Sequence, residues 1–176
     1  MTVPGRIIER VQKIGATVVT IDETTVIEAP VERCFDLARS VEVHLEGNIH
    51  WGESALAAAG VTSGLLGLGQ QVTWRARHFG VWHRLTSRVT KFERPDFFQD
   101  RMISGIFRFM EHDHFFTANG RRTIMRDVFR FAAPLPLLGR IAESAFLAGY
   151  MRRLLTERNA VIKRIAESGE WRQYLP

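Results

Sequence analysis

The segment MEHDHFFTANGRRTIMRDVF (residues 110–129) contains two runs of alternating side chains joined by Asn119-Gly120. Asn-Gly is the strongest short-range signal for a β-hairpin. If these two residues form the turn, His112 faces Asp127 and His114 faces Met125. One face is then mostly apolar but carries two imidazoles and a carboxylate, whereas the other is rich in charge. Because an unpaired buried polar group is costly, the inward polar side chains mark a candidate site.

A second hairpin is predicted from residues 72–79 and 82–92, which flank Gly80-Val81. A two-residue turn with glycine first is a common hairpin connection. In this register His78 faces His83 and Trp74 faces Ser87. One side is again apolar while the other carries arginines. Both hairpins therefore predict an antiparallel sheet with one buried and one solvated face.

The other segments add helices before and after these hairpins. The pattern predicts strands at 17–29, 51–58 and 97–104, short helices opening at Pro30 and at Val41, and a long helix over 138–168. Residues 1–14 form a lead-in segment. The expected fold class is α+β, with a curved antiparallel sheet of about seven strands wrapped around the C-terminal helix and two short helices after the first strand. We expect residues 1–176 to form a single domain.

Composition limits the functional classes. The 176-residue chain has a formal net charge of +5, and Cys34 is its only cysteine, which excludes an internal disulfide. No signal peptide and no uncharged span long enough to cross a membrane is visible. The sequence therefore predicts a cytoplasmic protein, and no cofactor is expected.

Several segments carry a resemblance to a known superfamily. The segments VTWRARHFG (72–80), MEHDHFF (110–116) and MRD (125–127) look like a bacterial subgroup described as cell-division-inhibitor-like or cyclase/dehydrase-like. The segment EAPVERCF (28–35) is similar to the usual strand-to-helix junction of the START/polyketide-cyclase (SRPBCC) superfamily. The resemblance covers nearly the whole chain and implies a helix-grip fold. Members of this superfamily bind lipids, sterols, polyketides and plant hormones, and only some are enzymes.

A ligand cavity between the sheet and the C-terminal helix is the main functional hypothesis. The protein is expected to bind or transport a small hydrophobic molecule, lipid-like or polyketide-like. The predicted apolar walls are Trp74, Met125, Phe129, Phe146 and Tyr150. The predicted polar end consists of His78, His112, His114 and Asp127.

The same polar residues allow three other interpretations. His112 and Asp127 could form a purely structural cross-strand pair. In a cyclase or dehydratase, His112 oriented by Asp127 could move a proton. Two histidines with Asp127 or His78 could also bind a metal, but no cysteine pattern or helical His-Glu-x-x-His spacing supports this, and no metal ligand is assigned.

The outward face of the sheet carries many arginines, including Arg75, Arg77, Arg84 and Arg88. Such a face is typical of a solvated, aggregation-resistant surface. It could also bind an acidic protein or an anionic lipid surface, so a protein-interaction module is a further alternative. No nucleic-acid-binding motif is present, and a nucleic acid partner is not expected.

Overall fold

The computed structural model describes residues 17–56, 60–133 and 140–176. The predicted lead-in at 1–14 and the first two residues of the predicted helix at 138–168 lie outside these ranges. The described elements are β1 (Val18–Ile27), α2 (Val31–Ala38), α3 (Val41–Gly47), β2 (Ser54–Leu56), β3 (Gln71–His78), β4 (Val81–Glu93), β5 (Phe97–Ser104), β6 (Phe109–Asn119), β7 (Arg122–Ala132) and α4 (Arg140–Glu167), with 3-10 turns at Ile49–Trp51 and Glu170–Gln173.

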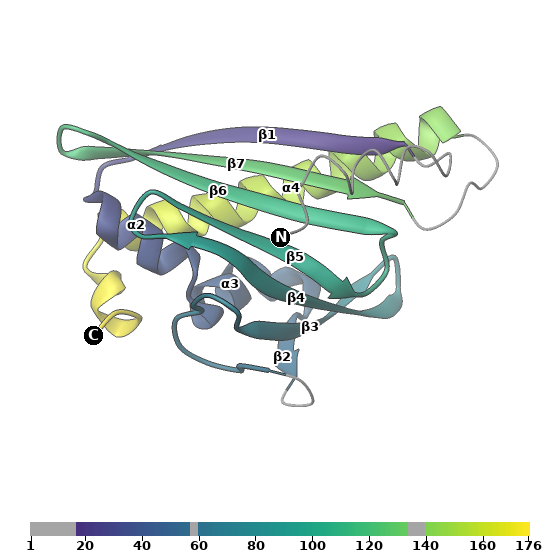
Figure 1. The fold of residues 1–176 in the computed structure, drawn as a ribbon, viewed down its shortest axis with the longest axis horizontal. Helices are drawn as coiled ribbons and strands as arrows, with labels where there is room; N and C mark the ends of the chain where they lie inside the picture. Colours follow the sequence, from purple (N-terminus) through teal and green to yellow (C-terminus); the bar gives the residue numbers. More distant parts are fainter. Residues whose placement is uncertain (1–16, 57–59, 134–139) are drawn as a thin grey trace.

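The strands form one antiparallel sheet in the order β1-β7-β6-β5-β4-β3-β2. The long helix α4 runs along one face of this sheet, and α2 and α3 lie at the same side (Figure 1). The predicted α+β architecture, with seven strands, two short helices after the first strand and a long C-terminal helix, is confirmed. Within the described ranges, no helix combines the length and apolar character that a membrane span requires.

The predicted register of the β6–β7 hairpin is wrong, because the turn begins one residue later than predicted. Gly120 and Arg121 form the turn, so Asn119 pairs with Arg122 and His114 pairs with Asp127. Gly120 has a φ of +63° and takes the first turn position, where a left-handed conformation costs glycine little. The pairing moves by two positions, and side chains alternate with a period of two. Every side chain therefore keeps its predicted face.

The predicted register of the β3–β4 hairpin is also wrong, in the opposite direction. The turn residues are Phe79 and Gly80, and His78 pairs with Val81. Both turn residues are left-handed, with φ values of +52° and +79°, which is the pattern of a type I′ turn whose twist matches the strands. This shift of two positions again leaves the inward face, which includes Trp74, unchanged.

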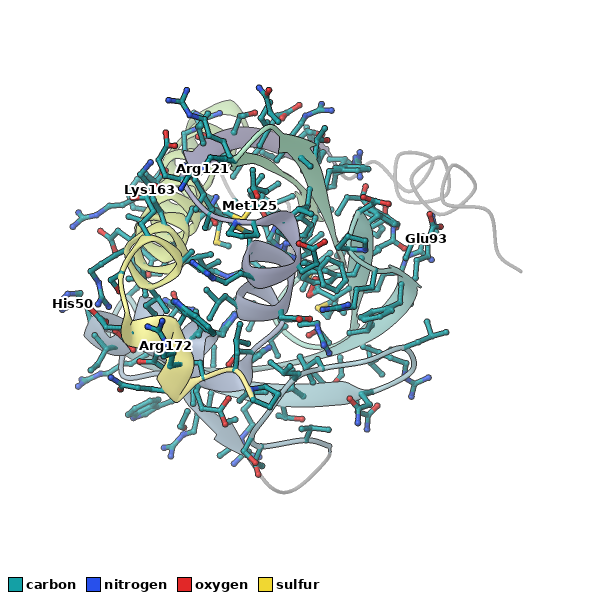
Figure 2. The ribbon with its side chains drawn as sticks, turned by 90° about the vertical axis from the view of Figure 1, so that its left-hand side faces the viewer. His50, Glu93, Arg121, Met125, Lys163 and Arg172 are labelled. Atoms are coloured by element: carbon teal, nitrogen blue, oxygen red, sulfur yellow. The ribbon has the colours of Figure 1, made fainter. Side chains whose placement is uncertain are left out.

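The inward face packs into two hydrophobic clusters. In the first, Phe35 of α2 meets Phe92, Phe98 and Phe116 edge-on at centroid distances of 5.3 to 5.5 Å. Figure 2 shows Met125 pointing into this interior. The second cluster lies toward the other end of the sheet, where residues such as Phe131 pack against α4. The polar side chains of β6 and β7 lie on the same face as both clusters, in a mostly apolar setting.

Two glycines in the loop before β3 differ in the space around them, and alanine substitutions test the described backbone of this loop. A Cβ atom at Gly60 would lie 2.1 Å from the carbonyl oxygen of Gln71, at a φ of +115°. At Gly64, with a φ of +81°, a Cβ atom would meet nothing within 4 Å. We expect Gly60→Ala to lower the free energy of unfolding by more than about 2 kcal/mol, and Gly64→Ala by only about 1 kcal/mol. Urea unfolding of both variants checks this, and equal losses would contradict the described loop.

Candidate functional site

A cavity of about 340 Å³ lies between the sheet and α4. Its size is at the lower end of the range for small-molecule sites. Strands β3 to β7 provide one side, α4 provides the other, and α3 contributes His44. The apolar lining includes Trp74, Leu85, Phe107, Met110, Phe129 and Leu154.

The cavity brings together five of the nine predicted ligand-binding residues. Trp74, His78, His112, Phe129 and Tyr150 all line it. They come from three separate parts of the chain, and the alternation of the strands and the periodicity of α4 turn them toward one another.

The other four predicted residues lie elsewhere. His114 lines a smaller adjoining cavity of about 50 Å³, and Asp127 is buried behind the two histidines. Met125 does not line the cavity because it is fully buried in the cluster around Phe35. Phe146 is 64% exposed and contacts Phe79, because its position on α4 faces outward beyond the turn of the β3–β4 hairpin.

The carboxylate of Asp127 is the centre of the buried polar group. Its Oδ1 atom lies 2.9 Å from Nε2 of His112 and 2.7 Å from Nδ1 of His114. Its Oδ2 atom accepts a hydrogen bond of 2.8 Å from the side-chain amide of Asn159 on α4. Asp127 is 1% exposed, and both imidazoles are at most 5% exposed. The sheet and the helix are therefore linked through one buried carboxylate.

The two imidazoles have opposite pKa shifts. Burial and the charge of His114 lower the pKa of His112 to about 4, despite the opposing effect of Asp127. Burial also disfavours the charged form of His114, but its contacts with Asp100 and Asp127 outweigh this and raise its pKa. At neutral pH His112 is therefore neutral. Of the two imidazoles, His114 has the higher pKa and binds a proton more readily.

The two carboxylates of the group are ionised. Burial would raise the pKa of Asp127, but the two imidazoles hold it well below its ordinary value. Burial also works against the charge on Asp100, while His114 and His112 lower the pKa of that carboxyl. The result is one buried anion, Asp127, and one partly buried anion, Asp100, both held mainly by histidines.

Arg158 of α4 supplies a second positive charge at this end of the cavity. It is 6% exposed, and its Nη2 donates a 3.0 Å hydrogen bond to the carbonyl of Ala38. Among the described residues, its Nε atom and Oδ1 of Asp100 have no hydrogen-bond partner although both are buried. Arg158 and Asp100 line the cavity beside His112. The inner end of the cavity thus combines a buried donor and a buried acceptor that make no hydrogen bond to these residues.

The outer end of the cavity is closed by a contact between the β3–β4 hairpin and α4. Nδ1 of His78 lies 2.6 Å from the hydroxyl of Tyr150. The Phe79 ring lies 4.7 Å from the Tyr150 ring, centroid to centroid, but is itself 61% exposed. Burial lowers the pKa of His78, and nearby His83 lowers it further. A largely neutral imidazole therefore borders the mouth.

A further histidine, His44 of α3, was missed by sequence reasoning. Its ring stacks on Trp74 at 3.9 Å, and its Nε2 lies 3.1 Å from Oε2 of Glu53. It also lies 3.0 Å from the amide of Asn48. All four residues line the cavity. Apart from Trp74, these residues lie in short segments, so no periodic pattern marked them.

Three further polar residues were also missed, although the sequence held a signal for each. Asp100 lies two residues after Phe98 on the same strand, so both side chains point to the apolar face of the sheet. Arg158 follows Leu154 by four residues and lies on the inward side of α4, and Asn159 is next to it. A charged or amide side chain at an apolar position of an amphipathic element could have indicated each of them.

The arginine face has local partners. The Arg75 guanidinium lies 4.2 Å from the centroid of the Trp82 ring. Arg77 and Arg88 donate hydrogen bonds within their own hairpin, and Arg84 is exposed. Binding of an acidic protein or an anionic lipid surface by these residues stays a prediction.

No protein-family model matches this chain, and no curated protein does. Several solved structures do. The Zhui aromatase/cyclase from Streptomyces sp. R1128 is 16% identical with a TM-score of 0.68, and the match covers 86% of this chain and 94% of that one. A START superfamily protein from Mycobacterium smegmatis is 14% identical with a TM-score of 0.63, covering 83% and 98%.

This protein has the helix-grip fold. A third structure, Ara h 8.0201, is 11% identical with a TM-score of 0.57, covering 83% and 98% of the two chains. At these identities the likeness establishes the fold and leaves the function to the site itself. The resemblance to the SRPBCC superfamily is confirmed at the level of the fold, and the bacterial subgroup stays a prediction.

His112 gives the site a testable pH dependence. The unfolded chain takes up a proton at this histidine near pH 6.5, whereas the folded protein does so only near pH 4. Lowering the pH through this window therefore removes stability, by about 2 kcal/mol at pH 4.5. His114 acts in the opposite sense, because its raised pKa contributes stability below pH 6.5 that is lost as the pH rises.

The check is urea unfolding of the wild type and His112→Asn between pH 7 and 4.5. EDTA in the buffer keeps cations off the imidazoles. The wild type should lose stability relative to the variant as the pH falls, and two parallel curves would show that His112 is not held neutral.

Proposed function

We propose that this protein binds a small, mostly apolar molecule in the cavity between the sheet and α4. The polar part of the molecule lies at the inner end, beside His112, Asp100 and Arg158. The observation that carries this proposal is an apolar cavity that ends in buried polar atoms with no hydrogen-bond partner in the described part of the chain. Apolar walls with a few convergent polar groups are the usual design of a small-molecule site.

The inner end favours a ligand group that can both accept and donate a hydrogen bond. Nε of Arg158 is a buried donor, and Oδ1 of Asp100 is a buried acceptor. Leaving such groups unpaired costs about 1–3 kcal/mol each. A hydroxyl or an enol of the ligand can donate to such an acceptor or accept from such a donor, and pairing with either atom would recover part of this free energy on binding.

The outer end supports a route of access between the β3–β4 turn and α4. His78 and Tyr150 meet there, and the neighbouring Phe79 and Phe146 rings are more than half exposed. Separating the turn from the helix would open the apolar walls to a ligand without disturbing the buried group at Asp127.

Ala76 provides a direct test of the cavity. This residue is 5% exposed and lines the cavity, whereas the next residue, Arg77, lies on the opposite face of the strand. We expect Ala76→Leu to weaken binding of the apolar fluorescent probe anilinonaphthalene sulfonate at least tenfold by filling the cavity, and Arg77→Ser to leave it unchanged. Equal affinities in a fluorescence titration of the two variants and the wild type would place the probe outside the cavity.

A second candidate function is catalysis by a cyclase or dehydratase. The observation that favours it is the contact between His112 and Asp127 at the cavity wall. With Nε2 turned to the carboxylate, Nδ1 of the neutral imidazole keeps its lone pair and can accept a proton. His112 would remove a proton during ring closure and return it to a departing hydroxyl, with Asp127 stabilising the transient imidazolium.

The catalytic candidate is tested with a synthetic poly-β-ketone thioester. We expect the wild type to accelerate cyclisation and His112→Asn to lose about 100-fold in rate. Arg77→Ser, which alters an exposed residue on the opposite face of β3, serves as the control and should keep the rate. Failure of the wild type to form any cyclised product above background would leave only the binding function.

A further inference from the structure

Three potential metal ligands meet at the inner end of the cavity. Asp100 of β5 and His112 of β6 lie directly opposite each other in the sheet, and His114 follows two residues later on the same face. One ligand atom from each side chain lies within 4.8 Å of the other two. The register of two neighbouring strands therefore fixes the cluster without any contribution from a loop.

The spacing of two of these atoms fits a shared cation better than a direct contact. Nε2 of His114 and Oδ1 of Asp100 are 3.7 Å apart, which is too far for a hydrogen bond. Two ligands bound at about 2.0–2.1 Å to one tetrahedral ion lie roughly 3.4 Å apart. Oδ1 of Asp100 is also buried and has no hydrogen-bond partner among the described residues, so an ion between the two atoms would satisfy it.

Asp127 and Asn159 form the support that such a site needs. Asp127 lies 2.7 Å from Nδ1 of His114, which leaves Nε2 of the same ring for a metal. Asn159 in turn fixes Asp127 with a 2.8 Å hydrogen bond. Metal-binding histidines usually donate their second ring nitrogen to a carboxylate in this way, which sets their tautomer and orientation.

We propose that Asp100, His112 and His114 bind one divalent transition-metal ion, of the zinc class, at the inner end of the cavity. Two imidazoles and one carboxylate are a typical ligand set for zinc and for cobalt substituted in its place. Asp100 and Asp127 supply two negative charges in the immediate surroundings.

Three protein ligands leave a coordination position open. Asp100 and His112 line the main cavity, as does Arg158. The open position therefore faces the space proposed for the organic ligand, and an oxygen atom of that ligand could complete the coordination. The metal site itself does not depend on the proposed function, because it is tested with the ion alone.

The first test is titration of chelator-treated protein with cobalt(II), whose visible absorption reports tetrahedral coordination. We expect one cobalt per chain, and competition by zinc. Asp100→Asn removes one charged ligand with almost no change in shape, and should weaken cobalt binding at least 100-fold. Glu53→Gln alters a carboxylate that contacts His44 at the same cavity, and should bind cobalt like the wild type. Equal affinities of wild type and Asp100→Asn would overturn the proposal.

A second measurement needs no variant. The chain has six histidines, and NMR resolves their imidazole signals. Stoichiometric zinc should shift the signals of His112 and His114 and leave those of His44, His50, His78 and His83 in place. Shifts confined to the latter four, or no stoichiometric shift at all, would show that the cluster is a closed ion-pair network and not a metal site.

Discussion

The buried carboxylate of Asp127 is the interaction on which the site depends. A charge with 1% exposure is tolerated only when its surroundings replace the water it has lost. Two imidazoles of β6 and an amide of α4 do so here. Because these groups come from both layers of the fold, the position of α4 on the sheet and the orientation of the histidines are set together.

The polar group also separates two regions with different roles. On one side, the aromatic rings around Phe35 pack edge-on against one another and hold α2 and the end of α4 against the sheet. On the other side, the walls stay apart and leave the space that ends at the turn of the β3–β4 hairpin. The site therefore has an inner end cross-linked by buried polar groups and an outer end where the His78–Tyr150 contact and the rings beside it join the hairpin to α4. This division suits a protein that must keep its polar recognition group fixed while a ligand enters.

Much of the sheet could be predicted from alternation alone. Both hairpin registers were wrong by two positions, because several turns are compatible with the sequences around Gly80 and Gly120. The inward faces were nevertheless correct, since a shift of two preserves the side on which each residue lies. His112, Trp74 and Phe129 were therefore placed on the cavity side before their partners were known.

The remaining parts of the site depend on tertiary packing that no local pattern encodes. The rotation of α4 about its axis decides that Arg158 and Asn159 face inward while Phe146 faces out. Likewise, Met125 shares the inward face with Asp127, but α2 covers it and the cavity does not extend that far. The approach of α3 brings His44 onto Trp74, a contact between segments about thirty residues apart.

Native mass spectrometry of the purified protein, followed by denaturing extraction of whatever is bound, shows whether the cavity holds a ligand. We expect a species heavier than the 20.1 kDa chain by one organic molecule, which is released on denaturation and reduced in amount in Ala76→Leu. A wild-type protein that shows only the mass of the bare chain, and that takes up no apolar probe in the cavity, would contradict it.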